Sequence, residues 1–461
     1  MTQSFDALII GAGQAGPPLA GRLTAAGMTV ALIERHLFGG TCVNTGCTPT
    51  KTLVASAYAA HLARRAADYG VMISGAIEVD MAQVKARVNT VVANSRSGLE
   101  AWLGSMERLT VFHGQARFES ANTLRVGDEL LTAPQIFINV GGRARVPKMP
   151  GIEKINYLTN TSMLALDSLP RHLVIVGGSY IGLEFAQIYR RFGAAVTVVE
   201  KGPRLVSRED EDISTAIRDV LEAEGVQVRT GAECIAFAPH ADGATVHLDC
   251  TDGEPAVIGS HVLLAVGRQP NTDDLGLDLA GIATDEHGYI TVDDQLRTTV
   301  PGIWALGDCN GRGAFTHTSY NDFEIVAANL LDGETRGVSD RILAYALYTD
   351  PPLGRVGLTE AQARATGRPL LMGTRPMTKV GRAIEKGETH GLIKIVADAE
   401  TQRILGAAIL GVGGDEAIHG LIDIMTADQP YTTLQRAVPI HPTVSELLPT
   451  VVGEMQPLPT S

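Results

Sequence analysis

Two cysteines with a short spacing are the residues of this sequence best suited to redox chemistry. Cys42 and Cys47 lie in the segment GGTCVNTGCTPTK, which also contains Pro49 and Lys51. Pro49 stands where a proline occupies the first position of a helix, which puts Cys47 near the helix N-terminus. The helix dipole and the Lys51 ammonium would both stabilise a thiolate there and lower the pKa of Cys47. These features predict a redox-active cysteine pair.

Two other interpretations of the pair fit the sequence less well. A metal site needs further ligands, but no second CxxC or HxxxH motif completes a set of four, and we predict no metal site. A buried, inert pair is the usual interpretation of arbitrary cysteines, yet the flanking glycines, proline and lysine argue against it. The other cysteines lack such surroundings and are interpreted as structural; they are Cys234, Cys250 and Cys309.

An internal repeat indicates how these residues are positioned. Residues 8–34 read LIIGAGQAGPPLAGRLTAAGMTVALIE, and residues 174–200 read VIVGGSYIGLEFAQIYRRFGAAVTVVE. Each copy contains an apolar strand, a glycine-rich turn, a helix ended by a glycine, a second strand and a terminal acid. This pattern is the start of a βαβ dinucleotide-binding unit. Two such units in one chain favour electron transfer between a tightly bound flavin and a diffusing nicotinamide.

The glycines of each turn have separate tasks. The first makes the tight turn, the second lets the backbone approach a pyrophosphate, and the third lets the helix pack closely against the strand. The helix N-terminus then faces the phosphates, and the terminal acid accepts hydrogen bonds from ribose hydroxyl groups. The positions are Gly11, Gly13, Gly16 and Glu34 in the first copy and Gly177, Ser179, Gly182 and Glu200 in the second.

The rest of the chain predicts an α/β protein of three domains. We expect residues 1–150 and 271–338 to form one dinucleotide-binding domain, with a second, residues 151–270, inserted between them. Residues 339–461 contain alternating strand-like segments around a turn and then a helical segment, which predict an α+β domain. The predicted fold class is therefore two Rossmann-like domains followed by an α+β domain.

Composition excludes several classes of function. The 461 residues include 38 basic and 51 acidic side chains, a net charge of −13, which does not suit binding to nucleic acid or to an anionic membrane. We find neither a secretory signal nor an apolar stretch of about 20 residues, so we expect no membrane span. With only five cysteines, the chain is expected to be cytoplasmic.

Five motifs together resemble the class I pyridine nucleotide–disulfide oxidoreductases. These motifs are GAGQAG, GGTCVNTGC, GGSYIGLE, ALGDCNG and HPTVSE, in the order of that family. The family includes glutathione reductase, dihydrolipoamide dehydrogenase and mercuric reductase. The resemblance implies an FAD-binding domain, an inserted NAD(P)-binding domain, a C-terminal dimerisation domain and a homodimer.

The resemblance also implies roles for the residues near the flavin. Cys47 resembles the sulfur beside the flavin, and Cys42 resembles the sulfur that exchanges with substrate, so the two would form a redox-active disulfide. Lys51 resembles the lysine near flavin N5, and Glu184 resembles the glutamate that pairs with it. Tyr180 takes the place of the aromatic gate over the nicotinamide pocket.

The HPTVSE motif resembles the acid–base pair of the family. His441 and Glu446 match the histidine and glutamate that serve the active site of the other subunit. A histidine suits proton transfer with thiols near neutral pH, and a carboxylate fixes its tautomer. The alternative is that the motif only caps a surface turn and helix.

Further positions are expected to contact the cofactors. Asp308 resembles the aspartate that contacts the ribityl chain of FAD. Ala116 matches the position whose backbone contacts the FAD adenine, and residues 314–317 match the backbone near the isoalloxazine. The positions expected to bind the cofactors are Gly11, Gly13, Gly16, Glu34, Gly40, Thr41, Lys51, Ala116, Gly141, Asp308, Ala314, Phe315, Thr316, His317, Gly177, Ser179, Tyr180, Ile181, Gly182, Glu184, Glu200 and Gly267.

The nicotinamide cofactor is expected to be NADH. Glu200 would accept a hydrogen bond from a free 2′-hydroxyl and repel a 2′-phosphate. Lys201 and Arg204 follow directly and could accommodate a phosphate, so NADPH remains possible.

Departures from the common family pattern bear on the substrate. No cysteine follows Cys309, so the C-terminal vicinal pair of mercuric reductases is absent from this sequence. Residues 349–357 read TDPPLGRVG instead of the common TDPEIASVG, and residues 315–326 read FTHTSYNDFEIV. Both segments resemble mercuric-reductase-like flavoproteins associated with reactive-chlorine resistance, for which metal-ion reduction has been proposed.

The resulting hypothesis is a homodimeric enzyme that passes electrons from NAD(P)H through FAD and the dithiol to an acceptor. The acceptor would be a small disulfide or a soft metal ion such as Cu(II) or Hg(II). Two alternatives remain open. One is oxidation of a dithiol with NAD, as in dihydrolipoamide dehydrogenase, and the other is a redox sensor whose disulfide state controls a partner.

Overall fold

A parallel sheet of five strands carries the first glycine-rich turn. The computed structural model describes residues 2–233, 235–249 and 254–459. The strand order is β19-β8-β2-β3-β4, and the sheet is parallel throughout. Strands β2 and β3 are buried along their whole length and are apolar except for Glu34 at the end of β3, as expected for strands covered on both faces. The strands are β2 (Ala7–Ile10), β3 (Val30–Glu34), β4 (Leu109–His113), β8 (Gln135–Ile138) and β19 (Ile303–Ala305).

A second parallel sheet repeats this arrangement around the second turn. Its order is β10-β17-β11-β12-β13. The central strands β11 and β12 pair in parallel and match β2 and β3 of the first sheet. The strands are β10 (Tyr157–Leu158), β11 (His172–Val176), β12 (Ala195–Val199), β13 (Gln227–Arg229) and β17 (His261–Leu264).

Glycine is required where each helix approaches its strand. Helices α1 (Gly16–Ala25) and α6 (Tyr180–Phe192) begin just after the two turns. A Cβ atom on Gly16 would lie 2.2 Å from the carbonyl oxygen of Gly11, and one on Gly182 would lie 2.1 Å from that of Gly177. The repeated pattern thus produces the same close packing twice.

The third sheet is antiparallel, with the order β20-β21-β24-β23-β22-β25. Strands β23 and β24 are the pair predicted around a turn, and the predicted helical segment is α12 (His419–Thr426). The strands are β20 (Ala344–Leu347), β21 (Leu353–Gly357), β22 (Leu370–Pro376), β23 (Leu392–Asp398), β24 (Ile404–Leu410) and β25 (Gln456–Pro457).

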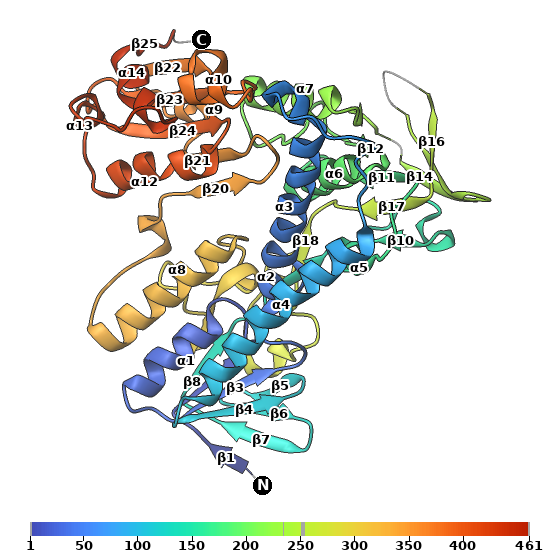
Figure 1. The fold of residues 1–461 in the computed structure, drawn as a ribbon. Helices are drawn as coiled ribbons and strands as arrows, with labels where there is room; N and C mark the ends of the chain where they lie inside the picture. Colours follow the sequence, from blue (N-terminus) through green and yellow to red (C-terminus); the bar gives the residue numbers. More distant parts are fainter. Residues whose placement is uncertain (1, 234, 250–253, 460–461) are drawn as a thin grey trace.

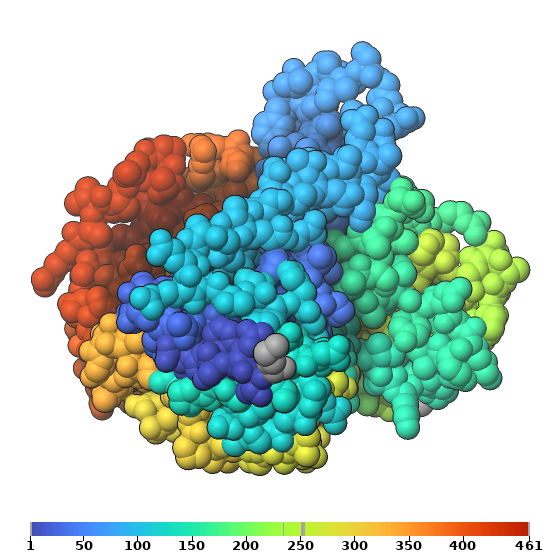
Figure 2. All heavy atoms as spheres, turned by 90° about the horizontal axis from the view of Figure 1, so that it is seen from below, coloured from blue at the N-terminus to red at the C-terminus, as the bar shows by residue number. Residues whose placement is uncertain are grey.

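Figure 1 shows the three largest sheets in separate lobes around the long helix α3 (Cys47–Arg64). Figure 2, seen from below, shows the N-terminal part of the chain between the red C-terminal lobe and the green second lobe. The remaining strands are β1 (Thr2–Ser4), β5 (Ala116–Ser120), β6 (Thr123–Val126), β7 (Glu129–Thr132), β9 (Gly142–Ala144), β14 (Ala236–His240), β15 (Gly243–His247), β16 (Ala256–Gly259) and β18 (Arg268–Pro270). The remaining helices are α2 (Gly40–Thr45), α4 (Met81–Gly104), α5 (Asn160–Ala165), α7 (Glu211–Ala223), α8 (Thr316–Ala327), α9 (Glu360–Ala365), α10 (Gly381–Glu385), α11 (Gly414–Ala417), α13 (Thr432–Gln435) and α14 (Leu448–Gly453).

One detail of the cysteine segment differs from the sequence-based expectation. Helix α3 begins at Cys47, so Pro49 is its third residue and not its first. Cys47 is therefore part of the first turn, where backbone N–H groups have no partner within the helix.

Candidate functional site

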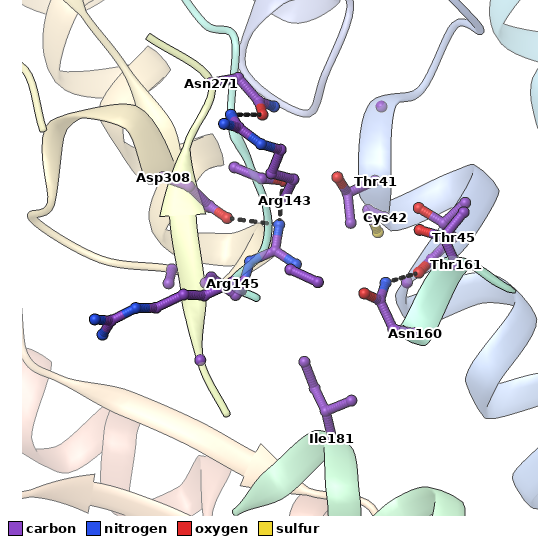
Figure 3. Close-up of a pocket in the computed structure, with 18 of the residues that line it drawn as sticks. Thr41, Cys42, Thr45, Arg143, Arg145, Asn160, Thr161, Ile181, Asn271 and Asp308 are labelled. Atoms are coloured by element: carbon purple, nitrogen blue, oxygen red, sulfur yellow. Dashed lines mark hydrogen bonds and ion pairs between the residues drawn. The ribbon is translucent and has the colours of Figure 1, made fainter. Parts of the chain in front are cut away.

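A cavity of about 2400 Å³ connects both glycine-rich turns with the cysteine pair. The close-up in Figure 3 shows Thr41, Cys42 and Thr45 on one side of this cavity, with Arg143 and Asp308 across from them. Two dinucleotide turns and two cysteines therefore open into one continuous space.

Nearly all of the predicted site residues line this cavity. Gly16 and Gly182 do not, because they lie beneath the turns, where they allow the helix to approach. The lining residues among those predicted are Gly11, Gly13, Glu34, Gly40, Thr41, Cys42, Cys47, Lys51, Ala116, Gly141, Gly177, Ser179, Tyr180, Ile181, Glu184, Glu200, Gly267, Asp308, Ala314, Phe315, Thr316 and His317.

The two cysteines are free thiols on neighbouring helices, Cys42 in α2 and Cys47 at the start of α3. A hydrogen bond from the Cys42 thiol is the main cause that lowers the pKa of Cys47 to about 6, and the nearby Lys51 charge contributes less. The same bond, together with burial, raises the pKa of Cys42. The Thr316 hydroxyl lies 3.3 Å from the Cys47 sulfur. Near neutral pH the pair is thus a Cys47 thiolate beside a Cys42 thiol.

Lys51 and Glu184 form a close ion pair beside the cysteines. The Lys51 Nζ atom lies 2.8 and 2.6 Å from the two carboxylate oxygens of Glu184, whose side chain is almost fully buried. The backbone N–H of Tyr348 donates to the same carboxylate at 3.1 Å, and Lys51 Nζ lies 4.6 Å from the centroid of the Tyr348 ring. The pair therefore joins α3, α6 and the C-terminal lobe at one point.

The two terminal acids have matching environments. Glu34 accepts a hydrogen bond from the N–H of Ala12 at 2.9 Å, and Glu200 accepts one from the N–H of Gly178 at 2.6 Å. The second oxygen of each acid accepts from the backbone N–H two residues further along, at 2.8 and 2.7 Å. Each carboxylate thus fixes its turn. It still has lone pairs for a ribose hydroxyl, because each oxygen can accept two hydrogen bonds.

The middle position of each turn leaves space that the protein does not fill. A Cβ atom on Gly13 would have its nearest neighbour at 3.4 Å, in the Asn139 side chain. The sequence has Ser179 at the matching position of the second turn, and its side chain caps no helix N–H. These open turns fit the pyrophosphates of two dinucleotides.

Asp308 lies at the end of β19, in the short helix Gly307–Asn310, and lines the cavity. Burial raises the pKa of its carboxyl group, and Arg268 lies 3.4 Å away. Asp322 of α8 accepts a hydrogen bond from the Gly307 N–H at 2.8 Å and holds this turn in place. Asp308 and Glu34 thus both line the cavity into which the first turn opens.

His441 and Glu446 are close to each other but do not line the cavity. The His441 Nδ1 atom lies 2.9 Å from the Glu446 carboxylate, while 81% of the His441 side chain is exposed. Within one chain the structure therefore brings these two residues together without bringing them to the cysteines.

Several lining residues carried no signal that sequence analysis could use. Arg143 donates to Asn271 at 3.1 Å, and Asn160 donates to the carbonyl of Thr45 at 2.8 Å, as Figure 3 shows. Tyr348 belongs to the C-terminal lobe and lies far in sequence from the motifs. These contacts arise only from tertiary packing.

Besides Cys42 and Cys47, the described residues contain one further cysteine, Cys309. Cys309 is buried and lies outside the cavity lining, whereas Cys234 and Cys250 lie outside the described residues. Among residues 2–233, 235–249 and 254–459, no group of three or more His, Cys, Asp or Glu side chains is arranged to hold a metal ion. In the same ranges, none of the helices combines the length and apolar character needed to span a membrane.

Comparison with known proteins identifies the family. The family model "Pyridine nucleotide-disulphide oxidoreductase" matches residues 5–322, and the dimerisation-domain model of the same family matches residues 343–452. The chain is 38% identical to the probable pyridine nucleotide-disulfide oxidoreductase RclA of Escherichia coli, covering 96% of this chain and 98% of the relative. It is 33% identical to mercuric reductase of Streptomyces lividans (96% and 94% covered) and 32% identical to dihydrolipoyl dehydrogenase of Cupriavidus necator (97% and 97% covered).

A solved structure agrees with these relatives. The HOCl-induced flavoprotein disulfide reductase RclA from Escherichia coli superposes with a TM-score of 0.88 at 37% identity, covering 97% of this chain and 99% of that chain. The same protein has been solved as a Cu(II) complex, with the same score and coverage. The predicted fold class and family are thereby confirmed. The chain belongs to the pyridine nucleotide-disulfide oxidoreductase family and is an FAD-dependent oxidoreductase that uses a pyridine nucleotide.

Proposed function

We propose that this protein is a homodimeric reductase that takes electrons from NADH and delivers them through FAD and the Cys42–Cys47 pair to a soft metal ion or a small disulfide. The observation that carries the proposal is the cysteine pair in its cavity. A thiolate at Cys47 and a thiol at Cys42 open into the space that connects the two dinucleotide turns. The match to the dimerisation-domain model supports the homodimer.

The first turn, Glu34 and Asp308 would hold FAD, while the second turn and Glu200 would hold the nicotinamide dinucleotide. When bound, these cofactors supply hydride transfer and a two-electron reduction of the Cys42–Cys47 disulfide. Lys51 and Glu184 would fix the charge next to Cys47, because their ion pair is close and the Glu184 side chain is buried. Domain boundaries at residues 150, 270 and 338 are part of this proposal.

The thiols would reduce a disulfide acceptor in two exchanges. Cys42 loses its proton to a base, attacks one sulfur of the acceptor and releases the first thiolate. Cys47 then attacks the Cys42 sulfur, which releases the second thiolate and forms the Cys42–Cys47 disulfide. We assign the base to the partner subunit's His441, since Glu446 at its Nδ1 atom leaves Nε2 free to accept the proton.

A metal ion is the second acceptor class. Thiolates are soft ligands that suit Cu(I), Hg(II) and related ions. Oxidation of the Cys47 thiolate and the Cys42 thiol to the disulfide supplies two electrons and releases one proton. The two electrons reduce two Cu(II) ions to Cu(I) or one Hg(II) ion to the metal. The mercuric reductase relatives and the Cu(II) complex of the Escherichia coli protein support this class.

The geometry supports NADH over NADPH. Glu200 lines the cavity and holds two backbone N–H groups, so its carboxylate is fixed beside the second turn and would repel a 2′-phosphate there. Arg204 turns away, towards the carbonyls of Ser207 and Glu209 at 3.4 and 3.3 Å, and does not line the cavity. Of the three basic residues that follow β12 (Lys201, Arg204 and Arg208), only Lys201 and Arg208 line the cavity.

The test is anaerobic stopped-flow reduction of the FAD-loaded protein by NADH or NADPH, followed by mixing with oxidised glutathione, lipoamide, Cu(II) or Hg(II). We expect rapid reduction by NADH, a kcat/KM at least about tenfold lower for NADPH, and repeated turnover with one acceptor class. Cys42→Ser should abolish turnover with disulfides, whereas Cys309→Ala, a change outside the cavity, should not.

Other outcomes would identify the alternatives. Faster NAD reduction by a dithiol than acceptor reduction by NADH would favour the direction of dihydrolipoyl dehydrogenase, to which the chain is also similar. Oxidation of the dithiol without turnover of any acceptor would favour a redox sensor. Failure of both NADH and NADPH to reduce bound FAD would overturn the proposal.

A further inference from the structure

An aromatic cluster lies between the second glycine-rich turn and the cysteine region. The ring of Tyr180, at the start of α6, meets Phe315 and Tyr345 edge-on at centroid distances of 6.4 and 5.6 Å. Phe315 stacks on Tyr345 and on His317, in both cases at 5.5 Å and 11°. Tyr180 and Phe315 line the cavity, whereas Tyr345 does not.

A buried carboxylate joins two of these rings. The Tyr345 hydroxyl donates to Oε1 of Glu209 at 2.7 Å, and the Tyr180 hydroxyl lies 3.4 Å from the same oxygen. The other oxygen of Glu209 accepts from Arg355 at 3.0 and 2.5 Å. Glu209 and Arg355 are each only 1% exposed, and neither lines the cavity.

The two segments that depart from the common family pattern, residues 349–357 and 315–326, both contribute to this cluster. Arg355 belongs to TDPPLGRVG, where the common pattern has a serine, and Phe315 and His317 belong to FTHTSYNDFEIV. A serine could not reach Glu209 with two charge-assisted hydrogen bonds. The two segments that distinguish this chain from the common pattern therefore supply the parts that surround Tyr180.

The position of Tyr180 has a consequence for hydride transfer. Its ring contacts Phe315, and the next residue, Thr316, contacts Cys47. The ring thus occupies space between the second dinucleotide turn and the residues beside the cysteines. Because hydride transfer requires the reacting rings to approach to about 3–3.5 Å, a nicotinamide that reaches past the second turn towards the cysteine side of the cavity would have to displace the Tyr180 ring. Whatever holds this ring opposes binding of the nicotinamide.

We propose that Glu209 and Tyr345 are positioning residues that act through Tyr180 and set the affinity of the cavity for NADH. This inference rests on the proposed function, since it needs an NADH site beside Tyr180. Neither residue lines the cavity, so each acts on the dinucleotide through the Tyr180 ring. Arg355 fixes the Glu209 carboxylate, which leaves Oε1 directed at the two hydroxyls.

The two hydroxyls share this oxygen unequally, because a carboxylate oxygen can accept two hydrogen bonds and the stronger one weakens the other. At 2.7 Å the Tyr345 hydroxyl forms a strong hydrogen bond to the carboxylate, whereas at 3.4 Å the Tyr180 hydroxyl forms a weak one. Burial and the charge of Glu209 raise the pKa of Tyr345 to about 12, so this hydroxyl remains a donor at neutral pH. Without the Tyr345 hydroxyl, Oε1 loses its stronger donor, so the Tyr180 hydroxyl can approach it more closely and the Tyr180 ring is held more firmly. Without the Tyr180 hydroxyl, the ring is held less firmly.

The test uses two hydroxyl deletions with opposite expected effects. In the FAD-loaded protein, the dependence of the FAD reduction rate on NADH concentration gives an apparent Kd and a limiting rate. Tyr345→Phe should raise the Kd for NADH by about threefold to tenfold, and Tyr180→Phe should lower it by a similar factor. Both substitutions should change Kd more than they change the limiting rate.

The double variant decides whether Tyr345 acts through Tyr180. In Tyr180→Phe/Tyr345→Phe there is no Tyr180 hydroxyl to take the vacated oxygen, so the Kd should equal that of Tyr180→Phe alone. The control is Tyr189→Phe, which removes another hydroxyl from α6, one that donates to the Met163 carbonyl at 3.3 Å. Its Kd for NADH should match that of the unchanged protein.

An unchanged Kd in Tyr345→Phe would overturn the inference. A shift of equal size in the Tyr180→Phe background would also overturn it, because Tyr345 would then act by another route. Both outcomes leave the proposed function intact, since NADH still reduces FAD. If NADH fails to reduce FAD in the unchanged protein, the proposed function and this inference fail together.

Discussion

At the scale of single residues, one hydrogen bond is the main cause of the difference in pKa between Cys42 and Cys47. Donation from the Cys42 thiol is the largest cause of the low pKa of Cys47, which lies near 6. In reduced protein without FAD, iodoacetamide should therefore label Cys47 faster than Cys42 at pH 7, with an inflection near pH 6. Peptide mass spectrometry after timed alkylation between pH 5 and 9 measures both rates.

The sign of this pH dependence follows from the direction of the shift. Cys47 is a thiolate above pH 6 and a thiol below it, so its labelling rate should fall as the pH drops through that value. Cys42→Ala removes the main cause, and the inflection should move up towards the ordinary thiol value of about 8.5. An inflection that stays near pH 6 in Cys42→Ala would show that another group stabilises the thiolate.

Sequence analysis found some residues of the site and not others for physical reasons. The Cys42–Cys47 pair stands within one short segment, and Lys51 and Glu184 each stand in a recognisable motif. Glu209 does not belong to a recognisable motif, because its partners Tyr345 and Arg355 come from strands β20 and β21 of a different lobe. A buried carboxylate of this kind is identifiable only once the packing is known.

At the scale of elements, substitution of an outer glycine of a turn should have a different effect from substitution of the middle glycine. Gly16→Ala places a Cβ atom 2.2 Å from a backbone oxygen, so it should destabilise the protein without FAD by about 1–3 kcal/mol. Gly13→Ala meets only a side chain at 3.4 Å and should leave that stability nearly unchanged. It should instead weaken FAD binding about tenfold or more, because the methyl group takes the space of the pyrophosphate.

Thermal unfolding with and without added FAD separates the two effects. FAD raises Tm only where it binds the folded state, so Gly13→Ala should lose most of this increase. Gly98→Ala is the control, since it lies in helix α4 with open space around the new methyl group. Equal losses of stability in Gly13→Ala and Gly16→Ala without FAD would contradict the separate tasks of the two glycines.

The repeat made the elements near the turns predictable. Two strands, a helix and a terminal acid occur twice with the same spacing. The structure pairs β2 with β3 and β11 with β12 in parallel. The start of α3 was less well predicted, because Pro49 is tolerated at the third helical position as well as the first. The sequence pattern alone did not distinguish these positions.

At the scale of the whole molecule, one chain does not complete the proposed site. His441 is paired with Glu446 but is absent from the lining of the cavity that holds the cysteines. Its neighbours Val438 and Ile440 are 96% and 79% exposed. Apolar side chains exposed to this extent are suited to burial against another protein surface. The partner subunit of the dimer would supply that surface and receive the histidine.

Hybrid dimers test this arrangement directly. His441→Ala should leave FAD reduction by NADH nearly intact and slow disulfide turnover by about 10²-fold or more, as expected for loss of an acid–base group. Cys42→Ser should also be inactive with disulfides. After subunit exchange at equal amounts, random pairing makes half of the dimers hybrid, each with one complete site, so activity should return to about one quarter of the unchanged protein.

A control mixture shows whether recovered activity comes from sharing between subunits. Cys42 and Cys47 act from the same chain, so mixing Cys42→Ser with Cys47→Ser should restore nothing. Native mass spectrometry of subunits labelled with different isotopes verifies that exchange has occurred. If exchange is complete and the His441→Ala mixture stays inactive, His441 does not serve the partner's cysteines.

With a metal ion as acceptor, His441→Ala should retain turnover, because electron transfer from the dithiol to the ion requires no proton donor for a leaving thiolate. Loss of metal reduction in His441→Ala would instead place the histidine at the metal acceptor as well.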